Sequence, residues 1–240
     1  MAAFWPKTHV SLGYLFFAGE PQEATMRHSI FGLAGFCAFL GLCDAAAAQI
    51  CRPVSERTRA GDVGCWIIAH GSMGQLAEPQ VFWHLDTFPT RAAADAAKGP
   101  RGTVVESYDK VWLLTIEAKG WRPSGGERIN EIGPLPVVAG RGYAAQYMEA
   151  TFDPGMTAPS HEHPGPEAWH TLTGETCLET PDGTFIGRAG GPPVIVPGGA
   201  PMHLTATGTE QRRSLVLILH DAAHNPTTPR RDFVPKGLCK

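Results

Sequence analysis

Residues 155–174 read GMTAPSHEHPGPEAWHTLTG, a stretch with a glycine at each end and several metal-ligand side chains between them. His161, His163 and Glu167 follow one another in the order His-x-His-x3-Glu. Because side chains alternate between the two faces of a β-strand, two histidines separated by one residue point to the same side. The Pro-Gly-Pro turn at 164–166 then allows the carboxylate to join them. Two imidazoles and a carboxylate suit Zn, Mn, Fe or Ni, so the stretch predicts a metal site with open coordination positions.

The beginning of the chain has the features of a secretory leader. Residues 26–43 combine a basic start with a short apolar run, and an Ala-x-Ala site stands before Gln49. This pattern predicts a signal peptide over 26–48 and a periplasmic or secreted product. An uncleaved N-terminal membrane anchor is the alternative, but the apolar run is too short to span a bilayer comfortably. Residues 1–25 are unusual in front of such a leader, so we expect Met26 to be the native start and the preceding residues a non-native extension.

The overall charge excludes some classes of partner. The formal net charge is −3 over 240 residues, and the arginine pairs do not form a basic patch. We therefore expect no nucleic-acid partner, and no stable membrane insertion once the leader is removed. The 28 glycines and 21 prolines favour short strands and many turns over a helical protein.

Cysteine usage agrees with export. Two of the six cysteines belong to the leader, and the remaining four are an even number, which predicts disulfides in an exported chain. Three pairings are open, and a bond between Cys51 and Cys239 is attractive because it would join the two ends of the mature chain. Free buried thiols are the alternative. The four cysteines are Cys51, Cys65, Cys177 and Cys239.

The first part of the mature chain predicts a small α+β segment over 49–120. An alanine-rich run at 89–99 opens with proline and closes with glycine, as a short helix does. Apolar runs bounded by turn residues surround it, so the expected order is strand, strand, helix, strand, strand. None of the histidines in this segment has ligand spacing. The expected strands lie at 65–69, 81–88, 103–107 and 110–116.

The rest of the chain has a wholly β pattern. Residues 120–142 are rich in glycine and proline and are expected to be a connector, and 223–240 are expected to be an irregular polar tail. Between them, short strands and turns alternate at the spacing of a sandwich or jelly-roll barrel. The expected strands lie at 143–152, 174–180, 192–197, 202–208 and 212–220.

The 155–174 stretch resembles the first motif of the cupin family at every position and spacing. A second cupin-like motif, Gly-x5-Pro-x-Gly, stands at 191–199. The resemblance covers 130–222 and implies a mainly β fold, a cupin double-stranded β-helix or jelly-roll barrel, preceded by the small α+β segment. That segment, 49–120, would alternatively be a degenerate cupin unit. Cupins commonly pair, so the resemblance also implies a homodimer.

The resemblance implies that His161, His163 and Glu167 hold a divalent ion of Mn, Fe, Zn or Ni in the barrel mouth. A fourth ligand, a histidine in the family pattern, falls on Met202, and His203 comes one residue later. Because an offset of one residue turns a strand side chain to the opposite face, we predict Met202 inside the barrel and His203 outside. A bulge in the preceding Gly-Gly pair would reverse the two positions.

Two further residues are expected in the pocket wall. Gln146 is the polar residue on the inward face of its strand, and Trp169 shares a strand face with Glu167. The sequence is compatible with two functions. The first is a metal-dependent enzyme of oxidoreductase, isomerase or lyase type that acts on a small organic molecule. The second is a metal-independent module that binds or senses a small ligand.

Overall fold

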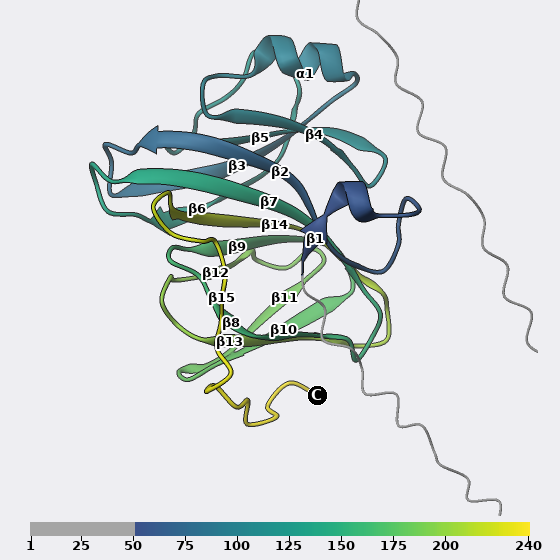
Figure 1. Cartoon of the computed structure of the whole chain (residues 1–240). Coiled ribbons are helices and arrows are strands. Elements are labelled where there is room, and N and C mark those ends of the chain that lie inside the picture. Colours follow the sequence, from purple (N-terminus) through teal and green to yellow (C-terminus); the bar gives the residue numbers. More distant parts are fainter. Residues whose placement is uncertain (1–50) are drawn as a thin grey trace, which may run out of the picture. The chain divides into compact units, whose positions relative to one another are not determined.

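The computed structural model describes residues 51–240, so the expected extension and signal peptide lie outside the described residues. The described chain is mainly β and is built from three sheets (Figure 1). Within these residues, no helix is both long enough and apolar enough to cross a membrane.

A six-stranded sheet, here called the central sheet, lies between the other two (Figure 1). All of its neighbouring strands are antiparallel except the first two, which run parallel. A short 3-10 helix, η1 (Val54–Glu56), follows the first strand. The strands in spatial order are β1 (Arg52–Pro53), β2 (Gly64–Gln75), β7 (Gly142–Phe152), β14 (Arg212–Asp221), β9 (Glu167–Thr173) and β12 (Val194–Val196).

A five-stranded sheet faces one side of the central sheet and forms a jelly-roll barrel with it. Apolar side chains from both sheets fill the space between them, which confirms the expected mainly β barrel. Its strands in spatial order are β11 (Gly183–Arg188), β10 (Glu175–Thr180), β13 (Met202–Thr207), β8 (Thr157–Glu162) and β15 (Thr228–Pro229). The barrel core includes Met148, Phe152, Leu178, Met202, Val216 and Ile218.

A four-stranded outer sheet covers the opposite face of the central sheet. It carries the short helix α1 (Arg91–Ala97), which begins after Thr90 with a side-chain cap on the backbone N–H of Ala93. The expected strand and helix order is confirmed, and the outer sheet forms one open layer, not a second barrel. Its strands are β4 (Gly102–Ser107), β5 (Lys110–Glu117), β3 (Gln80–Phe88) and β6 (Glu127–Pro136). The core beneath it includes Trp83, Trp112, Ile132, Tyr147, Leu215 and Leu217.

Strand β14 is buried on both faces, which explains its almost continuously apolar sequence. Val216 and Ile218 belong to the barrel core, whereas Leu215, Leu217 and Leu219 belong to the core under the outer sheet. A strand that is buried on both faces needs apolar side chains at odd and even positions alike. The central sheet therefore serves two cores at once.

One predicted strand was too short, and the predicted connector was wrong because it contains a strand. The strand expected at 65–69 continues to Gln75, because β2 follows β7 along its whole length through two register shifts. The connector expected at 120–142 contains β6, which pairs with β3. Its Pro134 and Pro136 are tolerated because β6 is an edge strand and has a neighbour on one side only. Small and turn-forming residues concealed both strands in the sequence.

The four cysteines of the described chain form two disulfides, and neither of them is the expected bond between the two ends of the mature chain. Cys51 bonds to Cys65, with an S–S distance of 1.99 Å, and Cys177 bonds to Cys239, with an S–S distance of 1.98 Å. The first pair forms because β1 lies beside β2 in parallel. The second joins the C-terminal tail to β10. The expectation of a Cys51–Cys239 bond is therefore wrong.

Candidate metal centre

The His-x-His-x3-Glu stretch spans the end of one strand and the start of another. His161 lies on β8, His163 lies in the turn, and Glu167 is the first residue of β9. A Cβ atom at Gly165 would stand 2.1 Å from the carbonyl oxygen of Leu219, so only glycine fits there. The turn is thus held against β14, which fixes where the carboxylate emerges.

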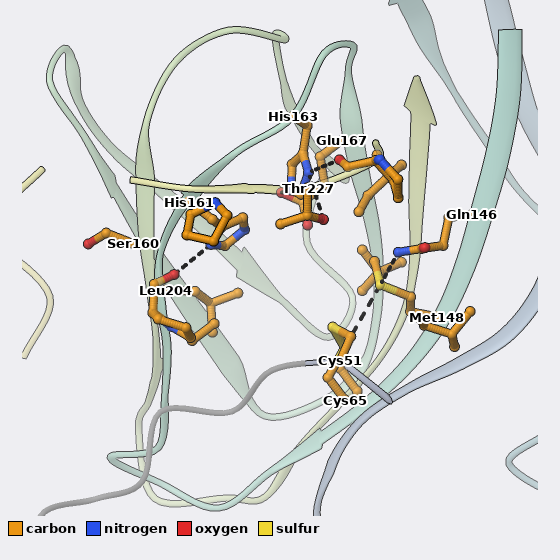
Figure 2. A pocket seen from close by; sticks show the side chains of 18 of the residues that line it. Cys51, Cys65, Gln146, Met148, Ser160, His161, His163, Glu167, Leu204 and Thr227 are labelled. Carbon is orange, nitrogen blue, oxygen red and sulfur yellow. Dashed lines mark hydrogen bonds and ion pairs between the residues drawn. A yellow bond between two sulfur atoms is a disulfide. The ribbon is translucent and has the colours of Figure 1, made fainter. Parts of the chain in front are cut away.

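The three side chains converge. One nitrogen of each histidine and one carboxylate oxygen of Glu167 lie within 4.8 Å of one another. The Nε2 atom of His163 is 3.6 Å from Oε2 of Glu167, and the two imidazole rings meet edge to face with centroids 4.8 Å apart. Figure 2 shows the three residues at one end of a cavity.

Backbone carbonyls fix the protonation of both imidazoles. Nδ1 of His161 lies 2.6 Å from the carbonyl oxygen of Pro159, and Nδ1 of His163 lies 2.7 Å from that of Pro226. A carbonyl oxygen can only accept, so each Nδ1 carries the proton and donates it. Each Nε2 therefore keeps a free lone pair, as in the outer-shell arrangement of metal-binding histidines.

The electrostatics favour the same protonation states. Burial lowers the pKa of His161 below its ordinary value of 6.5, and the neighbouring His163 acts in the same direction. Burial acts to raise the pKa of Glu167, but its interactions with His163 and His161 outweigh burial and leave this pKa below 4.5. A neutral imidazole and an ionised carboxylate are the forms that bind metal ions.

The cavity beside the three residues has a volume of about 670 Å³ and mostly apolar walls. Gln146 lies in its wall, and its Nε2 atom donates to Sδ of Met148 at 3.3 Å (Figure 2). The Cys51–Cys65 disulfide forms another part of the wall. The cavity can therefore enclose a small organic molecule with few polar groups along its length.

The position of the two motifs identifies the barrel. The first lies on β8 and β9, the second includes β12, and the backbone N–H of Gly199 donates to the carbonyl oxygen of His163 at 2.8 Å. Both motifs thus meet at one end of a barrel made of two facing antiparallel sheets. The barrel has the cupin fold.

Solved structures of cupin proteins are similar to part of the chain. No family model and no curated protein sequence matches the chain. A cupin superfamily protein from Desulfitobacterium hafniense is 18% identical with a TM-score of 0.30, over 36% of this chain and 74% of that one. A cupin-like protein from Thermotoga maritima is 18% identical with a TM-score of 0.33, over 36% of this chain and 64% of that one.

An oxalate oxidase is also similar, with 22% identity and a TM-score of 0.28, over 32% of this chain and 42% of that one. This chain therefore spans less than half of the oxalate oxidase. The strand arrangement and the two motifs define the cupin fold of the barrel.

Of the two candidates for a fourth ligand, His203 lies outside the converging cluster and Met202 does not line the cavity. The side chain of Met202 is fully buried in the barrel core. His203 is partly exposed, and its Nδ1 lies 3.4 Å from the hydroxyl of Ser160. A register shift between β13 and β8 begins at Met202. The described residues thus offer three converging ligands in the cupin barrel.

Trp169 lies in the core and not in the cavity wall, which corrects its expected position. Its ring packs 5.6 Å from the guanidinium carbon of Arg212 and is 1% exposed. The Arg212 side chain lines the cavity instead. The alternation of side chains along the strand predicted the correct face, but it could not predict which neighbour covers the ring.

The C-terminal tail contributes to the site, which the sequence did not indicate. Strand β15 pairs with β8 beside His161, and the carbonyl oxygen of Pro226 accepts a hydrogen bond from Nδ1 of His163. Glu162 forms an ion pair with Arg230 of the tail. In Figure 1 the tail runs past β8 toward the C-terminus. These contacts join residues more than sixty positions apart, so no local pattern predicts them.

Proposed function

We propose that the cupin barrel binds a divalent metal ion through His161, His163 and Glu167 and that it binds or transforms a small organic molecule in the adjoining cavity. The supporting observation is that Nε2 of His163 and Oε2 of Glu167 are buried without a hydrogen-bond partner among the described residues. Unpartnered buried polar atoms are costly, and a cation between them would remove this cost.

The residues around the ion have distinct tasks in this proposal. A divalent ion would act as a Lewis acid toward a substrate oxygen, or would activate water or O2. The carbonyls of Pro159 and Pro226 orient the two imidazoles, and Gln146 offers an amide to a polar group of the ligand. Three protein ligands leave open coordination positions for that ligand.

Metal analysis of the purified full-length product tests the proposal. We expect stoichiometric Mn, Fe, Zn or Ni in the wild type, and none in the His161→Ala, His163→Ala double variant. His203→Ala is the matched control, because it removes a nearby imidazole that lies outside the cluster. A wild-type protein that holds no metal even after reconstitution would contradict the proposal.

A metal-independent binding or sensing module is the second candidate. The observation that favours it is the burial of Met202 in the core with His203 outside the converging cluster, since four ligands would hold an ion more firmly. Ligand binding that is unchanged after chelation, and unchanged in the double histidine variant, would support this candidate over the first.

We further infer that the protein is exported to the periplasm or secreted. Two disulfides form in the described chain, and disulfides persist in oxidising compartments. The leader pattern at 26–48 agrees with this inference. N-terminal sequencing of the exported product should give a start near Gln49, whereas a product that begins before residue 26 would refute the leader assignment.

A further inference from the structure

Arg212 is a buried cation in the wall of the same cavity. It is the first residue of β14, it lines the cavity, and only 1% of it is exposed. Charged side chains are seldom buried to this degree unless another group neutralises them.

No carboxylate in the described chain pairs with Arg212. Its Nε donates to the hydroxyl of Ser214 at 3.1 Å, but its Nη2 is buried and has no hydrogen-bond partner among the described residues. The partly buried guanidinium of Arg128, in contrast, pairs with Asp86 at 2.7 Å. Arg212 therefore has a hydrogen-bonding capacity that the described chain leaves unused.

Aromatic rings hold the guanidinium in place. Its central carbon lies 5.4 Å from the Phe152 ring centroid and 5.6 Å from that of Trp169. Cation–π contacts of this kind contribute attraction but accept no hydrogen bond in the plane of the guanidinium. Burial lowers the pKa of Arg212 to about 10, so the side chain remains a cation at neutral pH. The rings thus fix its orientation while its donors stay available.

The route from Arg212 to the metal centre is apolar. Arg212, Val216 and Ile218 all line the cavity from β14, and Ile218 is the register partner of Glu167. The guanidinium and the three proposed ligands therefore lie at different positions along one cavity, with apolar side chains between them.

We infer that Arg212 binds the carboxylate of a small organic acid with an apolar middle, whose other end reaches the His161–His163–Glu167 centre. The second half of this inference rests on the proposed function. A planar carboxylate matches the two-pronged donor geometry of a guanidinium. A single arginine neutralises one negative charge, so a monoanionic group suits this apolar cavity better than a dianionic phosphate.

Paired probes test the inference. Hexanoate and hexanamide have the same length, but only hexanoate carries a charge. Isothermal titration measures binding of both probes to the full-length protein, first as purified and then after chelation. We expect hexanoate to bind at least about tenfold more tightly than hexanamide, which is the difference that one bidentate charged contact makes. Arg212→Met should abolish that preference. Arg213→Met is the matched control, because Arg213 is adjacent and exposed, and it should retain the preference.

The wild-type measurement alone tests the inferred carboxylate binding, even if Arg212→Met does not fold. Equal affinity for the two probes, or binding of neither, would overturn the inference, and so would a preference that persists in folded Arg212→Met. The metal content of the same samples separates this result from the proposed function. A preference that depends on Arg212 in a protein that holds no metal even after reconstitution supports the carboxylate site and refutes the metal centre.

Discussion

The protons of the two proposed ligand histidines are placed by carbonyl groups of residues outside the His-x-His-x3-Glu motif. Pro159 precedes the motif, whereas Pro226 comes from the tail, and each carbonyl holds an Nδ1 proton. This arrangement leaves the Nε2 lone pair of each imidazole free. A site organised in this way loses little rotational freedom when an ion binds.

At the residue scale, we predict that NMR titration of metal-free protein gives His161 a pKa below 6.5, because burial disfavours its charged form. Glu167→Gln should lower this pKa further, because the carboxylate favours the imidazolium, whereas His203→Gln should raise it. A pKa at or above 6.5 in the wild type would show that the ring is not buried as described.

The individual residues of the site differ in how well the local sequence predicts their positions. The three converging residues are read from strand alternation and one turn, so the motif alone predicts them. Arg212 is different, because Arg212-Arg213 looks like an exposed charged pair. Only the alternation of β14, which puts Arg212 on the same face as Val216, hints that one arginine is buried. Pro226 carries no such hint, since its role depends on a contact across the fold.

At the scale of elements, the turn between β8 and β9 depends on close backbone packing. A Cβ atom at Gly165 would overlap the Leu219 carbonyl, and a Cβ atom at Gly198 would lie 2.5 Å from the backbone nitrogen of Gly165. We predict that Gly165→Ala displaces Glu167, abolishes metal binding and lowers the free energy of unfolding by about 1–3 kcal/mol. Denaturant unfolding and metal analysis measure both effects.

Gly142→Ala is the matched control for that substitution. No atom lies within 4 Å of the Cβ position at Gly142, so the added methyl group should leave metal binding and stability nearly unchanged. Normal metal content in Gly165→Ala would show that the turn does not position the carboxylate.

The C-terminal tail is the second element with a testable role. In a Cys177→Ser background, truncation after Asn225 removes Pro226 and β15, and truncation after Asp232 keeps both. We predict that truncation after Asn225 weakens metal binding about 10- to 100-fold, because it removes the carbonyl partner of His163. Truncation after Asp232 should have a smaller effect. Equal affinities in competition with a chromophoric chelator would contradict this role.

At the scale of the whole molecule, the three layers explain why the sequence revealed one half of the chain better than the other. The cupin barrel has regular alternation and recognisable motifs. The outer sheet packs on a central sheet that is shared with the barrel, and its edge strand β6 contains prolines at positions where no neighbour needs a donor. Its place depends on the Trp83, Trp112 and Leu217 core, which sequence periodicity does not show.

The pH dependence of stability follows from histidines in both halves of the molecule. Burial is the leading cause that lowers the pKa values of His84, His161, His170 and His203 below 6.5. The unfolded chain therefore binds more protons than the folded chain between these lowered values and 6.5. Stability should be fully present above pH 6.5 and should fall as the pH drops through that window, by about 1.4 kcal/mol per pH unit for each histidine that titrates there.

His84 offers a clear test of this dependence, because its side chain is fully buried on β3, beside Trp121 and Ala118, and lies far in sequence from the metal centre. Its Nε2 lies 3.1 Å from the carbonyl oxygen of Ala118, a contact that the amide of a glutamine can imitate.

Denaturant unfolding of chelator-treated protein between pH 7.5 and 5.5 should show a declining stability in the wild type and a shallower decline in His84→Gln. A wild-type stability that is constant or rises on acidification would show that these imidazoles do not need to be neutral in the folded protein. An identical slope in the variant would assign the dependence to His161, His170 and His203 instead.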